Sequence, residues 1–284
     1  MKIWNYIISL LILILAGVTI AIFQLPDNNL HIIACDVGQG DAILAIYKNT
    51  QILTDGGPDN KVVSCLGKYL PFWDRNIELV ISTHPQKDHF SGLIEVVKRY
   101  KVDNILYSKL EVSSPGYKVL EKEVGSGGTN VIRPYTGQVL RIGLIQLDIL
   151  NSSDEQLPIT NFQFSNIVND MGIVTLLKYG QFKALFTADV ENAISDKLSV
   201  IREIEGVQYI KVNHHGSKNG LSENLLKAFM PTLAVISNGR NNVYGHPHKE
   251  ILGMLEKYKV KVLRTDQMGN VEVVTDGEKY WLKN

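Results

Sequence analysis

The sequence has no excess of charge of either sign. Its 284 residues include 29 Lys and Arg against 29 Asp and Glu, so the formal net charge is zero. This balance excludes a global positive field that would attract nucleic acid, although a local basic groove can still exist within a neutral total. Internal repeats and low-complexity tracts are also absent. The composition, 45% hydrophobic and 20% charged, is that of an ordinary globular protein with one large domain or two small ones.

Cysteine is almost absent as well. Cys35 and Cys65 are the only two, and neither lies in a cluster of histidines, so we do not expect them to bind metal. An extracytoplasmic location would permit a disulfide between them. Buried cysteines in apolar surroundings are more often free thiols. The sequence alone leaves both states open.

Long hydrophobic runs are missing except at the N-terminus. Residues 3–26 carry no charge, and residues 7–23 are almost wholly apolar, which is about the length of one membrane-spanning helix. Lys2 precedes the run, and positive charge favours the cytoplasmic side. We therefore expect residues 1–26 to be a single-pass anchor in the cell membrane and residues 27–284 to form an extracytoplasmic domain. A cleaved signal peptide is the alternative.

Hydrophobic patterning beyond this segment predicts a layered α/β domain. Short apolar runs bounded by turn residues predict strands. The expected strands are residues 31–35, 42–47, 51–54, 77–82, 173–177, 182–186, 209–212 and 232–237. Residues 92–100 and 249–258 have helical periodicity. Helices that follow strands in this way favour outer helical layers around central sheets.

Six of the seven histidines fall in three short clusters. These are His84 with His89, His214 with His215, and His246 with His248, while His31 lies outside. Imidazole and carboxylate groups are the usual protein ligands for zinc and similar transition metals. Asp55, His84, Asp189 and His214 each follow the end of an expected strand, and such strand ends can meet at one edge of a sheet. The pattern predicts a metal-dependent enzyme.

The first cluster resembles a known metal-binding motif. His84, Gln86, Asp88 and His89 match the His-x-His-x-Asp-His motif of the metallo-β-lactamase fold, with Gln86 in place of the middle histidine. Four further motifs follow the order seen in the metallo-hydrolase domain of the ComEC DNA-uptake family. They are Asp-Val-Gly-Gln-Gly-Asp at 36–41, Thr-Ala-Asp at 187–189, His-His-Gly-Ser at 214–217 and Tyr-Gly-His-Pro at 244–247. The resemblance covers roughly residue 30 to the C-terminus.

This resemblance implies an α/β fold, the αββα four-layer metallo-β-lactamase sandwich, with two divalent metal ions, Zn or Mn. His84 and Gln86 would hold one ion, and Asp88 and His89 the other. Asp189 would bridge the two ions. One histidine of the pair His214 and His215 would complete the second position, and the sequence leaves open which one. Asp88, His89 and Asp189 are the expected catalytic residues.

The resemblance also implies residues that support the ligands or contact the substrate. These are Asp41, Asp55, Asn169, Ser217 and His246. Carboxylates behind metal-bound histidines fix the orientation of the imidazole rings. For Asp41 and Asp55 the alternative is a simple turn residue before glycine.

Two departures from the motif weaken the first metal position. Gln86 is a neutral ligand, and no histidine lies between His89 and His214. We therefore expect a weak first site, with manganese as an alternative to zinc.

The expected reaction is hydrolysis of a phosphodiester, in DNA or in a small molecule, by metal-activated water. Alternatives are a small extracellular ester or a lactam as substrate, or a degenerate fold that binds without catalysis. With one spanning segment expected, a DNA channel would have to be a separate protein.

Overall fold

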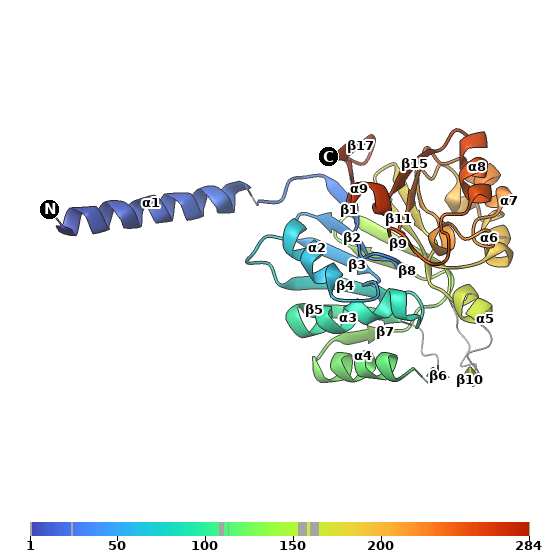
Figure 1. The fold of residues 1–284 in the computed structure, drawn as a ribbon, viewed down its shortest axis with the longest axis horizontal. Coiled ribbons are helices and arrows are strands. Elements are labelled where there is room, and N and C mark those ends of the chain that lie inside the picture. The colour runs from blue at the N-terminus through green and yellow to red at the C-terminus, as the bar shows by residue number, and fades with distance from the viewer. Residues whose placement is uncertain are drawn as a thin grey trace.

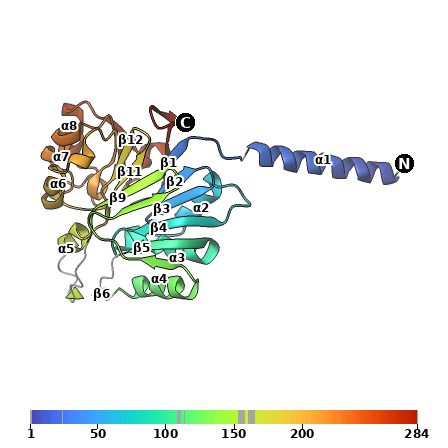
Figure 2. The same cartoon turned by 180° about the vertical axis from the view of Figure 1, so that it is seen from behind.

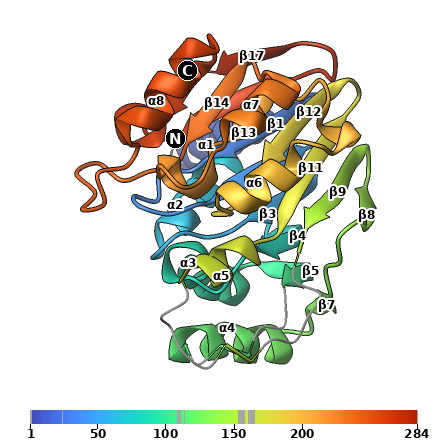
Figure 3. The same cartoon turned by 90° about the vertical axis from the view of Figure 1, so that its right-hand side faces the viewer.

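Two β-sheets packed face to face form the centre of the domain (Figures 1, 2 and 3). This computed structural model describes residues 2–23, 25–107, 111–112, 114–152, 158–159 and 165–283. The first sheet has the strand order β17-β16-β1-β2-β3-β4-β5-β7, and the second has the order β15-β14-β13-β12-β11-β9-β8. In each sheet, one part is parallel and the other is antiparallel.

The strands of the first sheet are β1 Leu30–Ala34, β2 Ile43–Tyr47, β3 Thr50–Thr54, β4 Asn76–Ser82, β5 Lys101–Tyr107, β7 Asn130–Ile132, β16 Val271–Thr275 and β17 Tyr280–Lys283. The strands of the second sheet are β8 Val139–Ile142, β9 Ile145–Asn151, β11 Val174–Tyr179, β12 Phe182–Phe186, β13 Tyr209–Lys211, β14 Leu233–Ile236 and β15 Lys261–Arg264. A separate parallel pair joins β6 Glu111–Val112 to β10 Pro158–Ile159. The strands expected from the sequence all fall within these two sheets.

Helices cover the outer face of each sheet (Figure 3). The first sheet is covered by α2 Lys61–Tyr69, α3 Lys87–Arg99 and α4 Pro115–Ser126, and the second by α6 Asn192–Leu198, α7 Glu223–Phe229 and α8 Lys249–Lys257. Shorter elements are α5 Ser165–Asp170, α9 Thr265–Met268, η1 Arg202–Ile204 and η2 Asn213–Gly216. The predicted αββα sandwich is confirmed.

Three hydrophobic layers hold this arrangement together. Ile32 of β1 and Tyr209 of β13 pack in the layer between the sheets. Their neighbours Ile33 and Ile210 point the opposite way and pack against the outer helices. Because successive side chains of a strand alternate between faces, strands buried on both faces read as continuous apolar runs. For this reason the apolar runs in the sequence identified the strands.

A disulfide joins Cys35, which follows β1, to Cys65 on α2. The two Cα atoms are 6.0 Å apart, and both cysteines are buried in the layer under α2. The bond ties the residue before the 36–41 loop to a helix that follows the turn at Asp55. The more common state of free buried thiols is not the one found here.

Two sequence predictions about helices need correction. Within the part of the chain that the structure describes, no helix has both the length and the apolar character needed to cross a membrane. The predicted anchor at residues 1–26 is therefore unsupported, although α1 Lys2–Phe23 is a helix that projects away from the sandwich (Figure 1). Residues 1 and 24 of that segment lie outside the described residues. The helix expected at 92–100 begins instead at Lys87, because the acidic residue Asp88 suits the positive end of a helix.

His31 links the segment before β1 to the last hairpin of the first sheet. Its Nε2 lies 3.0 Å from Asp27 Oδ1, and its Nδ1 lies 2.7 Å from Glu272 Oε1. Burial lowers the pKa of His31, but the bonds to Glu272 and Asp27 outweigh it and raise the pKa above the ordinary value. Both ring nitrogens can donate only when the ring is protonated.

We predict that this clamp stabilises the fold at low pH only. A raised pKa in the folded state adds stability that is fully present below the unfolded pKa of about 6.5 and is lost as pH rises through the folded pKa. The free energy of unfolding of wild type and His31→Gln should therefore differ most below about pH 6.5. Urea unfolding at a series of pH values measures this difference. A difference that grows with pH would contradict the prediction.

Candidate metal centre

The clustered residues meet where parallel strands of both sheets end. In the first sheet, Asp55 follows β3 and His84 follows β4. In the second sheet, Asp189 comes three residues after the end of β12, and the histidine pair at 214–215 follows β13. Parallel strands present their carboxyl ends at the same edge of a sheet. Residues more than a hundred positions apart are brought together in this way.

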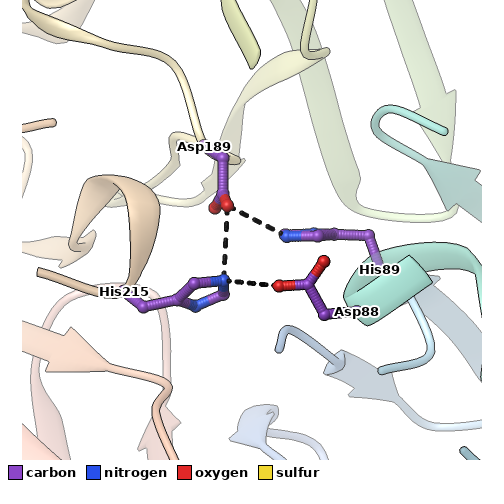
Figure 4. A group of neighbouring side chains, drawn as sticks. All are labelled: Asp88, His89, Asp189 and His215. Atoms are coloured by element: carbon purple, nitrogen blue, oxygen red, sulfur yellow. Dashed lines mark ion pairs between the residues drawn. The ribbon is translucent and has the colours of Figure 1, made fainter. Parts of the chain in front are cut away.

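Four side chains form the centre of the site: Asp88, His89, Asp189 and His215 (Figure 4). Asp189 Oδ2 lies 3.2 Å from His89 Nε2 and 3.3 Å from His215 Nε2. His215 Nε2 is also 3.4 Å from Asp88 Oδ2. All four ligand atoms lie within 4.8 Å of one another. Two imidazoles and two carboxylates at this spacing have the donor chemistry of a zinc or manganese site.

The inward-facing atoms have no other partner. His84 Nε2, His89 Nε2, His215 Nε2 and Asp189 Oδ2 are buried and make no hydrogen bond. A buried polar atom without a partner costs free energy, so such atoms are rare and call for an explanation. A metal ion among them would satisfy these atoms together. The residues present therefore fit a divalent ion.

The outward-facing ring nitrogens are all held. His89 Nδ1 bonds Asp55 Oδ2 at 2.8 Å, and His215 Nδ1 donates to the carbonyl oxygen of Ser237 at 2.9 Å. The hydroxyl of Thr83 donates to Asp55 and lies 2.9 Å from His84 Nδ1. A proton on each Nδ1 leaves the Nε2 lone pair free to face a metal. Asp55 thus lies behind the ring of His89.

The electrostatics of the cluster favour a cation. Burial lowers the pKa of His89, but Asp189, Asp55 and Asp88 outweigh it and raise the pKa well above the ordinary value. Burial raises the pKa of Asp189, but His215, His89 and Lys211 hold it well below the ordinary value. Burial and the neighbouring His89 lower the pKa of His84 to about 3, so that ring is neutral near pH 7. The Asp189 carboxylate therefore stays ionised and attracts positive charge.

The structure distinguishes the two histidines of the pair. His215 is 1% exposed and belongs to the central group. The side chain of His214 is 24% exposed, and its Nε2 lies 3.9 Å from Asp189 Oδ2. Both residues have left-handed backbone angles, with φ of 47° and 54°, so the chain turns sharply between them. One ring points into the site and the other lies at its rim.

Gln86 and Asn169 face each other beside His84. Gln86 Nε2 donates to Asn169 Oδ1 at 2.5 Å. Neither amide belongs to the central group of four. His84 Nε2 remains without a partner, and its ring centre lies 4.1 Å from that of His89. Beside the central group, the structure thus places one unpartnered imidazole nitrogen and an amide pair that is already hydrogen-bonded.

The motif at 36–41 brings a further carboxylate to the site. Its last residue, Asp41, lies 3.5 Å from His215 Nδ1 and 3.8 Å from His89 Nδ1. Gly40 has φ of 139°, and a Cβ there would lie 2.2 Å from the carbonyl oxygen of Asp88. Only glycine allows this approach, which explains the glycine at position 40. Asp41 thus lies beside the Nδ1 atoms of both rings.

His246 and its neighbours line the rim. The ring of His246 lies 5.7 Å from that of His214 and stacks on Tyr244 at 5.7 Å. Tyr244 is 62% exposed. Ser217 is buried, and its backbone amide donates to the carbonyl of His214, so it closes the turn that holds the histidine pair. His246 therefore lies beside His214 at the rim of the site.

Lys211 is the residue that sequence reasoning missed. It ends β13, is completely buried and pairs with Asp41. Burial lowers the pKa of Lys211, but Asp41 and Asp189 raise it above the ordinary value, so the ammonium stays charged. A lysine within an apolar run, three residues before His214, was the available signal. Lysine is almost never fully buried unless it is paired.

Comparison with known proteins agrees with this geometry. No protein-family model matches the chain. ComE operon protein 3 of Bacillus subtilis is 27% identical over 255 residues, covering 84% of this chain and 32% of its own length. Recombination protein 2 of Haemophilus influenzae is 28% identical over 267 residues, covering 92% of this chain and 31% of its own length. The chain thus spans about a third of the length of these curated relatives, which are of the ComEC family that its motifs resemble.

Solved structures show the same fold. The metallo-β-lactamase fold protein YhfI from Bacillus subtilis superimposes with a TM-score of 0.56 at 13% identity. The match covers 89% of this chain and all of that one. The chain therefore has the metallo-β-lactamase fold.

We predict that the two adjacent histidines differ in metal binding. His215→Ala removes a central ligand atom and should lower metal affinity by more than the roughly 10–100-fold typical of losing a supporting residue. His214→Ala should change it less, because that ring lies at the rim. Metal content after dialysis and competition with a chelator measure both. An equal loss in the two variants would contradict the assignment.

Proposed function

We propose that this metallo-β-lactamase-fold chain, a metal-dependent hydrolase, cleaves phosphodiesters. The observation that carries the metal dependence is the set of buried, unpartnered atoms of His84, His89, His215 and Asp189. Among the described residues none of these atoms makes a hydrogen bond, although His89 Nε2 and His215 Nε2 face Asp189 Oδ2 at 3.2 Å and 3.3 Å, and a divalent ion would satisfy all four atoms. A bound divalent ion supplies activated water and stabilises negative charge on a phosphate.

Individual residues take the following roles in this proposal. Asp88, His89, Asp189 and His215 hold the principal ion. His84, Gln86 and the shared Asp189 offer a second and weaker position, because Gln86 is neutral and is engaged by Asn169. Asp55 and Asp41 orient the imidazole rings from behind.

Four basic residues close in sequence to the site residues favour an anionic substrate. Lys87 precedes Asp88 at the start of α3, and Lys218 follows the histidine pair. Arg240 and Lys249 flank the loop that carries His246. All four basic residues are exposed, so they can supply local positive charge although the net charge is zero. This favours a phosphate-bearing substrate over an uncharged lactam.

DNA is the phosphodiester that the relatives suggest. Their printed names refer to recombination and to the ComE operon, and these names describe those proteins as wholes. We carry DNA to this chain as a proposal. A small phosphodiester is the second candidate, and a separate DNA channel protein remains a prediction that rests on the sequence alone.

We also propose that the domain works outside the cytoplasm. The Cys35–Cys65 bond supports this location, because disulfides persist in oxidising compartments and are rare in the cytosol. This proposal does not depend on α1 crossing a membrane.

The substrate proposal predicts which compounds the protein hydrolyses. Metal-free protein reloaded with manganese or zinc should hydrolyse bis-p-nitrophenyl phosphate and single-stranded DNA, and should leave a chromogenic lactam intact. DNA binding should weaken steeply with salt, because lysine and arginine displace counterions from phosphates. Turnover of the lactam alone would overturn the proposal. Turnover of the diester without DNA cleavage would select the small substrate.

The weak first position predicts a gain on substitution. Gln86→His replaces a neutral amide with an imidazole and should raise metal affinity at the first position, while leaving the principal position unchanged. Titration calorimetry with zinc should then resolve a tighter second binding event. Asn169→Ala is a matched variant that frees Gln86 without adding a ligand, so it should show a smaller gain. Weaker first-site binding in folded Gln86→His would mean that Gln86 contacts the substrate instead.

A further inference from the structure

Lys211 carries a positive charge into the space between the two sheets. Tyr209, two residues earlier on β13, packs in the layer between the sheets, and Ile210 packs against the outer helices. Strand alternation places Lys211 on the same side as Tyr209. Its side chain is completely buried, at the edge where the candidate metal centre lies. No described feature of the proposed hydrolysis uses this ammonium.

Three oxygen atoms surround the Lys211 ammonium, one for each of its three N–H donors. It forms a short ion pair with Asp41 Oδ2, which comes from the first sheet. It donates to the carbonyl oxygen of Ala188 at 3.1 Å. It also lies 3.5 Å from Asp189 Oδ1. A lysine ammonium has three donors, so its capacity is fully used here.

The same residue holds the turn that presents Asp189. The hydroxyl of Thr187 donates to the carbonyl oxygen of Lys211 at 2.6 Å. Ala188 has a left-handed backbone, with φ of 49°, which is costly for a residue with a Cβ. Its carbonyl accepts from the Lys211 ammonium. Lys211 therefore fixes this strained turn through both its main chain and its side chain.

The two carboxylate oxygens of Asp189 have different surroundings, because Lys211 approaches only one of them. Oδ1 faces the ammonium, whereas Oδ2 faces His89 and His215 and has no hydrogen-bond partner. Asp41, Asp55 and His89 form a second group with metal-like spacing, and Asp41 in that group is already paired with the ammonium. Lys211 thus places a positive charge from within the chain against this second group.

We propose that Lys211 is a positioning residue that restricts Asp189 to a single ligand oxygen. This inference rests on the proposed function, because it concerns how the chain prepares its site for a metal. With Oδ1 held by the ammonium, Asp189 offers only Oδ2. The restriction keeps a coordination position open, which is what separates catalytic metal sites from closed structural ones.

The test compares two full-length variants that differ only at Lys211. Lys211→Met alone would leave the buried Asp41 carboxylate without a cation, which can by itself prevent folding. Asp41→Asn removes that charge, so Asp41→Asn and Asp41→Asn/Lys211→Met form a matched pair. Each is loaded with Co²⁺, whose visible absorption weakens as its coordination number rises. Bound Co²⁺ and turnover of bis-p-nitrophenyl phosphate are measured on the same samples.

We expect the double variant to bind Co²⁺ with weaker visible absorption, because Asp189 Oδ1 becomes free to join the ion. Turnover should fall by roughly tenfold or more relative to Asp41→Asn, the range seen when a residue that orients ligands is lost. Asp148→Asn and Asp148→Asn/Lys178→Met, from an ion pair on β9 and β11, are the control and should give identical spectra.

Two results would overturn the proposal in distinguishable ways. Identical spectra and turnover in the Asp41→Asn pair would mean that Lys211 only neutralises Asp41, while the metal site itself stands. Absence of Co²⁺ binding in wild type and in every variant would overturn the proposed function together with this inference.

Discussion

Concentrated negative charge at the edge where the two sheets meet is the constraint on which this structure depends. Asp41 and Asp55 come from loops of the first sheet, Asp88 from α3, and Asp189 from the second sheet. Buried carboxylates this close repel one another unless cations or donors lie among them. Lys211 and the imidazole rings lie among these carboxylates and reduce their repulsion. The remaining unpartnered atoms are arranged in a way that suits a divalent ion. The sandwich brings these groups together, and the charge determines what can lie between them.

Backbone conformation follows from the same constraint. Asp55, Ala188, His214 and His215 all have positive φ although none is glycine. Such conformations are costly and persist only where the surrounding structure imposes them. Each of these residues lies at or beside the candidate metal centre, within four residues of the end of a buried strand. The regular core supplies the stability that holds these turns in place.

The sequence predicted the sandwich and most of the site because its signals were local. Apolar runs marked the strands, and polar residues after Thr54, Thr83 and Phe186 marked their ends. The order of the motifs then resembled that of a known family, and this resemblance predicted the fold. The choice between His214 and His215 was out of reach, because two left-handed residues in succession do not follow any side-chain periodicity.

Other features depended on long-range contacts that one sequence cannot reveal. Lys211 looked like one residue of a strand, and its importance comes from Asp41, which lies 170 positions earlier on the other sheet. The Cys35–Cys65 bond likewise depends on where α2 packs. The start of α3 was placed five residues late, because glycine and serine near its middle resemble a turn. The length and composition of the N-terminal run suggested a membrane span that the structure does not support.

The pairing of β1 with β16 has a consequence for how the chain folds. Leu30 lies opposite Thr275 and Ala34 opposite Val271. The first strand of the chain can therefore pair on this side only after one of the last strands has been synthesised. During synthesis the first sheet keeps an open edge along β1 until nearly the whole chain has emerged. Contacts of such high sequence separation slow folding, and exposed strand edges favour association with other chains. Because of this strand order, the unpaired edge of β1 stays open to association with other chains until β16 has been synthesised.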